Sequence, residues 1–259
     1  MRHFRKYFKL TAAFVLFPVA LFFSVYSLEQ QGFFKIDKVE IRVDAPASQK
    51  NFVAAKVKQL QIKLNSIKGI PLWKAPLSQV SQSLKEEKWI KKFQINRAWP
   101  SGIVLVVEPD DVAILVMSQE GIQATVSPDA SYIRPITKSG NVLEKIKSGT
   151  SPNAIITRDA IFLGSQKVRN GAIEVINSLP KNGGMSAARV SEIGYDKKEG
   201  YWIKLLKSET KVNFGEEHFE IKSTRISQVI DYLESRNLKA RVIDANLSKK
   251  VLVRLQQNP

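Results

Sequence analysis

Hydrophobic and polar positions alternate along residues 89–108, and this alternation is the most informative pattern in the chain. Phe93 and Ile95 alternate with polar neighbours, which is the period of a half-buried strand. Pro100 and Gly102 then supply turn residues. The run from Ile103 to Val107 is aliphatic throughout, as expected for a second strand. The pattern therefore predicts a β-hairpin.

A short α+β unit is predicted around this hairpin. Alternating apolar residues in 33–43 indicate a first strand. An apolar stripe predicts a helix over 48–64, with Ser48 as its cap. A shorter helix follows over 76–87, since Pro76 suits a first helical turn. The predicted order over residues 33–109 is strand, helix, helix, strand, strand.

The remaining residues, 112–259, predict a second region with a mixed antiparallel sheet and flanking helices. Residues 136–157 are weakly patterned and are interpreted as a loop. Apolar periodicity predicts helices over 168–179 and 221–235. The predicted strands are 112–117, two runs within 123–136 split by a turn at 127–131, and 188–195, 201–206, 211–214, 240–244 and 251–255. The fold class is α+β.

The N-terminus carries a long apolar segment. Residues 10–28 contain no charged side chain, and at about 1.5 Å per residue they span roughly 28 Å, close to the thickness of a bilayer core. Four basic residues in the tail 1–9 favour a cytoplasmic N-terminus, with the bulk of the chain outside the cytoplasm. A cleaved signal peptide is the alternative, although its apolar core would be unusually long. The segment is therefore interpreted as a single membrane-spanning helix.

Composition narrows the classes of function. The net charge of +16 first suggests nucleic acid or an anionic surface. Because the predicted location is outside the cytoplasm, nucleic acid is not expected, and contact with anionic lipid or an anionic envelope polymer is the alternative to simple solvation. Cysteine is absent, so disulfides and thiolate chemistry are excluded.

Candidate catalytic groups are sparse. His218 follows two glutamates, but a polar loop before a helix is the simpler interpretation. Asp110 and Asp111 are interpreted as a solvated linker rather than a carboxylate pair. Three of the four tryptophans lie on elements whose periodicity predicts core or sheet-face packing, so sugar binding is not expected. Trp99 is expected to pack in the core of the unit that contains the hairpin. We therefore expect no enzyme activity, no metal and no cofactor.

The hairpin residues resemble a known family. The sequence is similar to the motif of the bacterial cell-division family FtsQ/DivIB at Trp89, Ile90, Ile95, Arg97, Trp99, Pro100, Ile103, Leu105 and Glu108. The C-terminal strand 251–255 fits the last strand of that family. The resemblance implies a cytoplasmic tail at 1–9, a transmembrane helix at 10–28, a β-α-α-β-β POTRA domain at 33–109 and a C-terminal β domain at 112–259.

The resemblance also implies a function. It predicts a membrane-anchored divisome scaffold at the septum that binds an FtsB–FtsL pair and supports septal cell-wall synthesis. The predicted docking site is an edge strand to which a partner strand is added. Its residues are Val251, Leu252, Val253, Arg254 and Leu255, together with Ile226, Ile230 and Leu233 of the preceding helix. The alternatives are a POTRA-containing component of envelope protein secretion or assembly, and a tethered envelope hydrolase.

Overall fold

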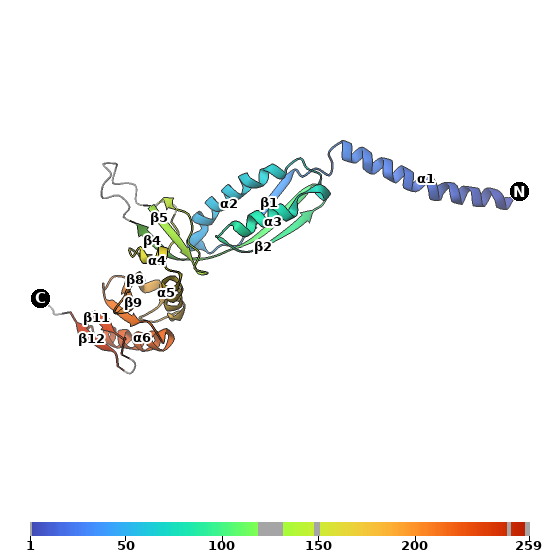
Figure 1. Ribbon diagram of the computed structural model, residues 1–259. Helices are drawn as coiled ribbons and strands as arrows, with labels where there is room; N and C mark the ends of the chain where they lie inside the picture. Colours follow the sequence, from blue (N-terminus) through green and yellow to red (C-terminus); the bar gives the residue numbers. More distant parts are fainter. Residues whose placement is uncertain (1, 119–131, 148–150, 248–249, 257–259) are drawn as a thin grey trace, which may run out of the picture. The chain divides into compact units, whose positions relative to one another are not determined.

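The computed structural model describes residues 2–118, 132–147, 151–247 and 250–256, with side chains from Leu16 onward (Figure 1). The chain divides into two compact units. Unit 1 comprises residues 1–44 and 54–109, and unit 2 comprises residues 45–53 and 110–259. Each unit has its own sheet. They are described separately below.

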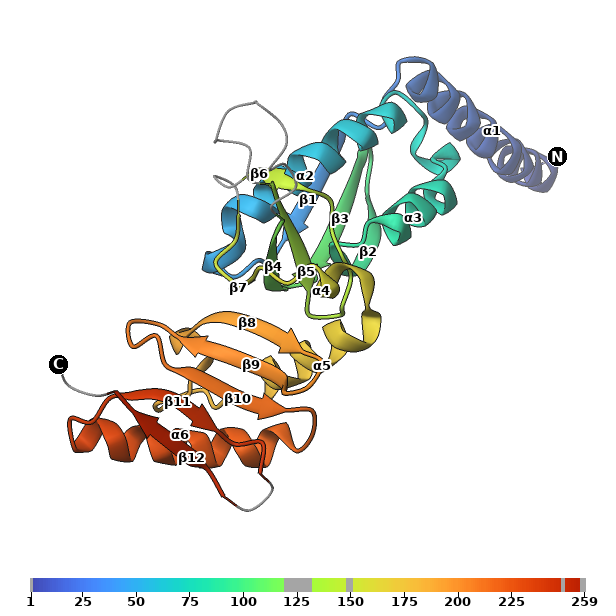
Figure 2. The ribbon, with the colours of Figure 1, turned by 60° about the vertical axis from the view of Figure 1, so that its left-hand side comes forward.

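Unit 1 contains a three-stranded sheet in the order β1-β3-β2. β3 is the middle strand, parallel to β1 and antiparallel to β2, and its Ile103, Leu105 and Val107 side chains are buried. The helices α2 and α3 lie alongside this sheet (Figure 2). The elements are α1 (Arg2–Gln30), β1 (Lys38–Val43), α2 (Lys50–Leu64), α3 (Leu77–Glu86), β2 (Ile90–Ala98) and β3 (Gly102–Pro109).

The start of α2 differs from the expectation. A short 3₁₀ turn, Ala47–Gln49, precedes the helix, and no side chain caps that turn. Ser48 therefore does not cap the helix. Within unit 2, the Gln49 side chain instead donates to the carbonyl of Val112 at 3.3 Å and accepts from its amide at 3.1 Å. This buried glutamine satisfies two backbone groups where β4 begins.

Unit 2 contains a nine-stranded sheet in the order β12-β11-β10-β9-β8-β7-β4-β5-β6. Parallel pairs join β4 to β7, β7 to β8 and β10 to β11, and the other pairs are antiparallel. The strands are β4 (Val112–Ser118), β5 (Tyr132–Thr137), β6 (Ile146–Lys147), β7 (Ile155–Thr157), β8 (Val190–Asp196), β9 (Gly200–Leu205), β10 (Lys211–Gly215), β11 (Ala240–Asp244) and β12 (Leu252–Leu255).

Helices cover one face of the β8–β12 part of this sheet (Figure 2). They are α5 (Gln166–Ser178) and α6 (Phe219–Ser235), and a single turn, α4 (Ile161–Gly164), precedes α5. α5 approaches β9 closely, because a Cβ on Gly171 would lie 2.1 Å from the Tyr201 hydroxyl oxygen. That hydroxyl donates to the carbonyl of Val168 at 3.2 Å, and burial raises the pKa of Tyr201 to about 12.

The α+β class with sheets of mixed strand orientation is confirmed. The loop predicted over 136–157 is wrong in part, because β6 and β7 form there and β5 extends to Thr137. These strands are short, and β7 pairs with strands distant in sequence, so local alternation is weak. Of the two runs predicted within 123–136, the second forms β5, whereas the first run and the turn at 127–131 lie outside the described residues.

Candidate functional site

The strand β12 forms one end of the sheet of unit 2. It pairs antiparallel with β11, with Val253 opposite Ile243 and Leu252 opposite Asp244. No strand follows it in the sheet order, so its other side is open within the described parts of the chain (Figure 2). An open strand side offers backbone donors and acceptors to an added strand.

The backbone groups that face the open side can be assigned from the pairing. Gln256, just after β12, donates its amide to the carbonyl of Lys239 at 2.8 Å, so its N–H points toward the chain of β11. Backbone N–H groups point alternately to one side and the other along an antiparallel strand. The register shift in this pair places one extra residue on β11, so the alternation along β12 is not interrupted. The amides of Arg254 and Leu252 therefore also face β11. Those of Val253 and Leu255 face outward.

The side chains of this strand divide into two sets. Val251 and Val253 are half-buried and pack against the core of unit 2. Leu252 and Leu255 are 52% and 48% exposed. Arg254 is also exposed. The edge therefore presents free backbone groups, two accessible leucines and one cation.

The helix residues of the predicted site are not at the surface. Ile226, Ile230 and Leu233 of α6 are buried in the same core. Their stripe faces the sheet, which is the usual role of an apolar helix face. A partner cannot contact these side chains in this structure, so they support the strand and do not form a contact surface. This corrects the helix part of the predicted site.

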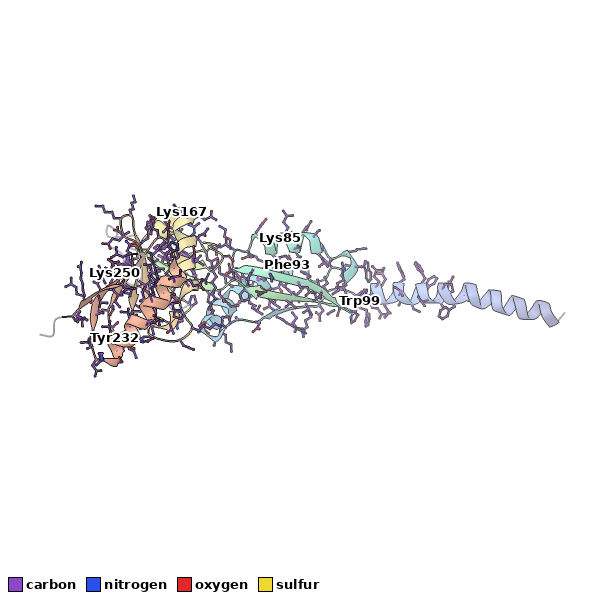
Figure 3. The ribbon with its side chains drawn as sticks, turned by 90° about the horizontal axis from the view of Figure 1, so that it is seen from below. Lys85, Phe93, Trp99, Lys167, Tyr232 and Lys250 are labelled. Carbon is purple, nitrogen blue, oxygen red and sulfur yellow. The ribbon has the colours of Figure 1, made fainter. Side chains whose placement is uncertain are left out.

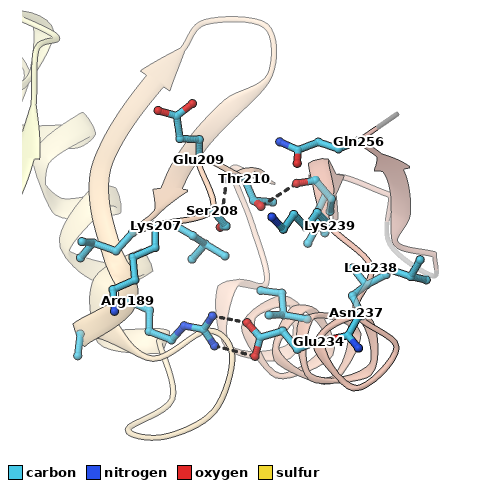
Figure 4. A pocket seen from close by; sticks show the side chains of 17 residues that line it. Arg189, Lys207, Ser208, Glu209, Thr210, Glu234, Asn237, Leu238, Lys239 and Gln256 are labelled. Atoms are coloured by element: carbon cyan, nitrogen blue, oxygen red, sulfur yellow. Dashed lines mark hydrogen bonds and ion pairs between the residues drawn. The ribbon is translucent and has the colours of Figure 1, made fainter. Parts of the chain in front are cut away.

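A groove of about 1210 Å³ lies beside the end of β12 (Figure 4). Its walls are the β9–β10 loop, the end of α6 and the start of β11, and Gln256 contributes to it. Leu206 and Leu238 are exposed there. Sequence analysis missed this groove because its walls come together only through the sheet.

Three residues at this groove have left-handed backbone conformations. Lys207, Glu209 and Asn237 have φ values of 69°, 53° and 54°. Such conformations are uncommon for residues other than glycine. The Thr210 hydroxyl, which donates to the carbonyl of Ala240 at 2.8 Å, holds the loop against β11. Asn237 lies just after the helix predicted over 221–235, whereas no signal in the sequence marks Lys207 or Glu209.

An ion pair closes one wall of the groove. Arg189 donates through Nη1 to Glu234 Oε2 at 3.1 Å and through Nη2 to the other carboxylate oxygen (Figure 4). The hydrogen bond from Arg189 lowers the pKa of Glu234 below its ordinary value. The pair joins the segment before β8 to the last turn of α6.

The hairpin motif of unit 1 does not form one site, because its Trp89, Ile103 and Leu105 are buried. Arg97 Nε donates to the carbonyl of Leu72 at 3.2 Å. Glu108 pairs with Lys91 at 3.0 Å. Trp99, expected to pack in the core, is 65% exposed and lies at the hairpin tip, followed by the cis peptide bond to Pro100 (Figure 3). The tip extends beyond the last strand pair, Ala98 with Gly102, so neither sheet face covers the indole.

Titratable side chains buried in unit 2 include Asp110, Tyr201 and Lys222. Asp110 is only 4% exposed, so its assignment to a solvated linker is wrong. Lys222 on α6 donates through Nζ to the carbonyl of Phe214 at 2.7 Å, and desolvation lowers its pKa. His218 precedes α6, and its side chain is exposed beside Glu217 at 3.9 Å. Among the described residues, no group of three or more acidic or histidine side chains is arranged to hold a metal ion.

The predicted membrane segment is only partly described, because side chains before Leu16 lie outside the described set. Residues 2–30 form the helix α1, with Pro18 inside it. A search restricted to the described residues finds no helix with the length and apolar character needed to cross a membrane.

These features define an α+β protein of two units whose candidate site is an open sheet edge beside a groove. The family model for the C-terminal domain of cell division protein FtsQ/DivIB matches residues 124–246. Cell division protein FtsQ of Geobacter sp. (strain M21) is 20% identical over 186 residues, which cover 72% of this chain and 66% of that relative. Both matches are to cell-division proteins, and they support the resemblance of this chain to the FtsQ/DivIB family.

Proposed function

We propose that this chain is a non-enzymatic, membrane-anchored scaffold of the division machinery that captures a partner strand on β12. The observation that carries the proposal is the open side of β12, where the Val253 and Leu255 amides face outward beside exposed leucines. Strand addition draws affinity from main-chain hydrogen bonds and specificity from neighbouring side chains. Leu252, Arg254 and Leu255 are the side chains placed to supply that specificity.

The anchor is residues 10–28, with the tail 1–9 in the cytoplasm. The uncharged stretch and its four preceding basic residues support this assignment. Units 1 and 2 would then lie outside the cytoplasm at the septum. The partners are an FtsB-like and an FtsL-like protein, as expected for the family, and the scaffold would support septal wall synthesis. The comparisons favour this role over a secretion component, because both matches are to cell-division proteins.

The test uses two neighbouring substitutions that differ in which side of the strand they affect. Val253→Pro removes a donor that faces the open side, a position where an edge strand tolerates proline. Arg254→Pro removes a donor that faces β11 and thus breaks the sheet. We expect the full-length Val253→Pro chain in detergent to retain its fold and lose capture of a purified FtsB–FtsL pair. Arg254→Pro should lose β12 pairing as well.

Circular dichroism melts and hydrogen exchange at β11 separate the two variants. Val253→Pro should keep the β11 protection and a cooperative melt, shifted only slightly by the altered packing of this half-buried side chain. Arg254→Pro should lower the β11 protection. A folded Val253→Pro chain that still captures the pair with wild-type affinity would contradict strand addition at β12. The site would then move to the surface of unit 1 around Ile36–Val43.

A further inference from the structure

Four aromatic side chains form a cluster on the surface of unit 1. Phe34 is at its centre, with ring centroids 5.2 Å from Phe33, 5.2 Å from Trp73 and 6.2 Å from Trp99. Phe33, Trp73 and Trp99 are 50%, 39% and 65% exposed. We call these four residues the aromatic cluster. The cluster includes Trp99, which the hairpin pattern had wrongly placed in the core.

Backbone hydrogen bonds fix the three segments that carry the cluster. The carbonyl of Phe34 accepts from the amide of Leu72 at 2.9 Å, next to Trp73. The amide of Asp37 donates to the carbonyl of Ser101 at 2.9 Å, close to Trp99. The segment after α1, the 3₁₀ turn Leu72–Lys74 and the hairpin tip are thus joined, and the rings project from one firmly held end of unit 1.

Exposed basic residues lie close to the cluster along the chain and form what we call the basic rim. Lys35, Lys74 and Arg97 are exposed and adjoin the cluster in sequence, and Lys68 is exposed on the neighbouring turn. The acidic residues nearby in sequence are Glu29 and Asp37. Exposed aromatic rings with a basic rim match the composition of the membrane–water interface, where tryptophan is enriched and anionic headgroups attract lysine and arginine.

We infer that the aromatic cluster inserts into the lipid–water interface of the membrane, with the basic rim against anionic headgroups. This inference rests on the proposed anchor. Phe33 follows closely after the end of the apolar stretch 10–28, so an anchor there would hold the aromatic cluster near the membrane. Amphipathic rings gain from such a position, since their apolar bodies leave water while their polar edges stay hydrated. The contact fixes one end of unit 1 at the bilayer surface.

Fluorescence quenching tests this inference with the full-length chain. The chain is reconstituted into phosphatidylcholine–phosphatidylglycerol vesicles whose acyl chains are brominated either near the headgroup or near the terminal methyl. Flotation first establishes that the chain is membrane-bound. We expect bromine near the headgroup to quench tryptophan emission more strongly than bromine near the terminal methyl. Replacing phosphatidylglycerol with phosphatidylcholine should weaken that quenching. Equal quenching in both kinds of vesicle would contradict the contact between the basic rim and anionic headgroups.

Two variants assign the signal. Trp73→Phe with Trp99→Phe should lose the quenching by shallow bromine, whereas Trp202→Phe in unit 2 should retain it. Trp89 is buried and remains in both as an internal reference. The interfacial contact would be overturned by a chain that floats but is not quenched, or by quenching that persists in the double variant. The aromatic cluster would then be assigned to binding of a protein partner. Failure to float would overturn the anchor itself, and with it this inference, without bearing on capture by β12.

Discussion

The outer strands of the two sheets present different surfaces to solvent. In unit 1, β1 exposes Lys38 and Arg42, and the exposed side chains of β2 are all polar or charged. In unit 2, β12 exposes Leu252 and Leu255 beside a single charge, Arg254, and the other end strand, β6, is only two residues long. Charges and short length discourage pairing with another chain. The comparison teaches that three of these four outer strands are protected and that β12 is the one suited to strand addition.

The largest expected effect is a loss of stability in unit 1 that leaves partner binding by unit 2 intact. Leu105 is buried on the middle strand of unit 1. Leu105→Ala should lower the free energy of unfolding of unit 1 by about 2–5 kcal/mol, because it leaves a cavity in the core. Urea denaturation followed by the emission of buried Trp89 measures this, with exposed Val106→Ala as the matched control.

Capture of the FtsB–FtsL pair by Leu105→Ala should stay close to wild type while unit 2 remains folded. Loss of capture under those conditions would show that unit 1 contributes to the docking surface, and the contrast between the two sheets would fail.

A charge on the open edge should have the next largest effect. Leu252→Glu places a charged side chain on β12, and exposed charges are what discourage β1 and β2 from pairing with another chain. We expect it to weaken partner capture by more than about 1 kcal/mol without unfolding the sheet. Isothermal titration calorimetry with the FtsB–FtsL pair measures the change. Gln94→Glu, at an exposed position of β2, is the control and should bind normally; equal weakening by both would indicate a general charge effect.

The ion pair beside the groove should have a smaller effect that depends on pH. Because the pKa of Glu234 is lowered in the folded chain, its contribution is present above the ordinary carboxyl pKa and is lost as pH falls through the lowered value. Glu234→Gln should remove this acid-range loss. The pair is partly exposed, so the change at neutral pH should stay below about 1 kcal/mol.

Melts of the wild type and of Glu234→Gln across the acid range measure the difference. Glu86→Gln on the exposed surface of α3 in unit 1 is the control and should follow the wild type. Parallel acid-range curves for the wild type and Glu234→Gln would contradict the assignment.

The smallest expected effect is that of Trp99→Ala on stability. Because its indole is 65% exposed, truncation in detergent should change the free energy of unfolding by no more than about 0.5 kcal/mol. A loss comparable to that of Leu105→Ala would mean that the ring is buried in solution. The exposed position described for the hairpin tip would then be wrong.

The order of elements in unit 1 could be predicted because each segment carries its own period and its own turn residues. Trp99 was misplaced because hydrophobicity alone does not tell that a residue lies past the last strand pair. In unit 2, α6 was expected from 221 and begins at Phe219, whose ring is buried. β7 could not be predicted, because its partners are remote in sequence. The groove likewise depends on residues from 188 to 256 meeting through the sheet.

The buried amine of Lys222 has a consequence for chemical footprinting. Its lowered pKa leaves a larger neutral fraction than an ordinary lysine has, and neutral amines are the form that acylating reagents attack. Burial and the bond to the Phe214 carbonyl nevertheless shield it while α6 lies on β10. The rate at which Lys222 becomes acylated therefore reports how often α6 lifts from the sheet, and mass spectrometry can follow that opening with no engineered label.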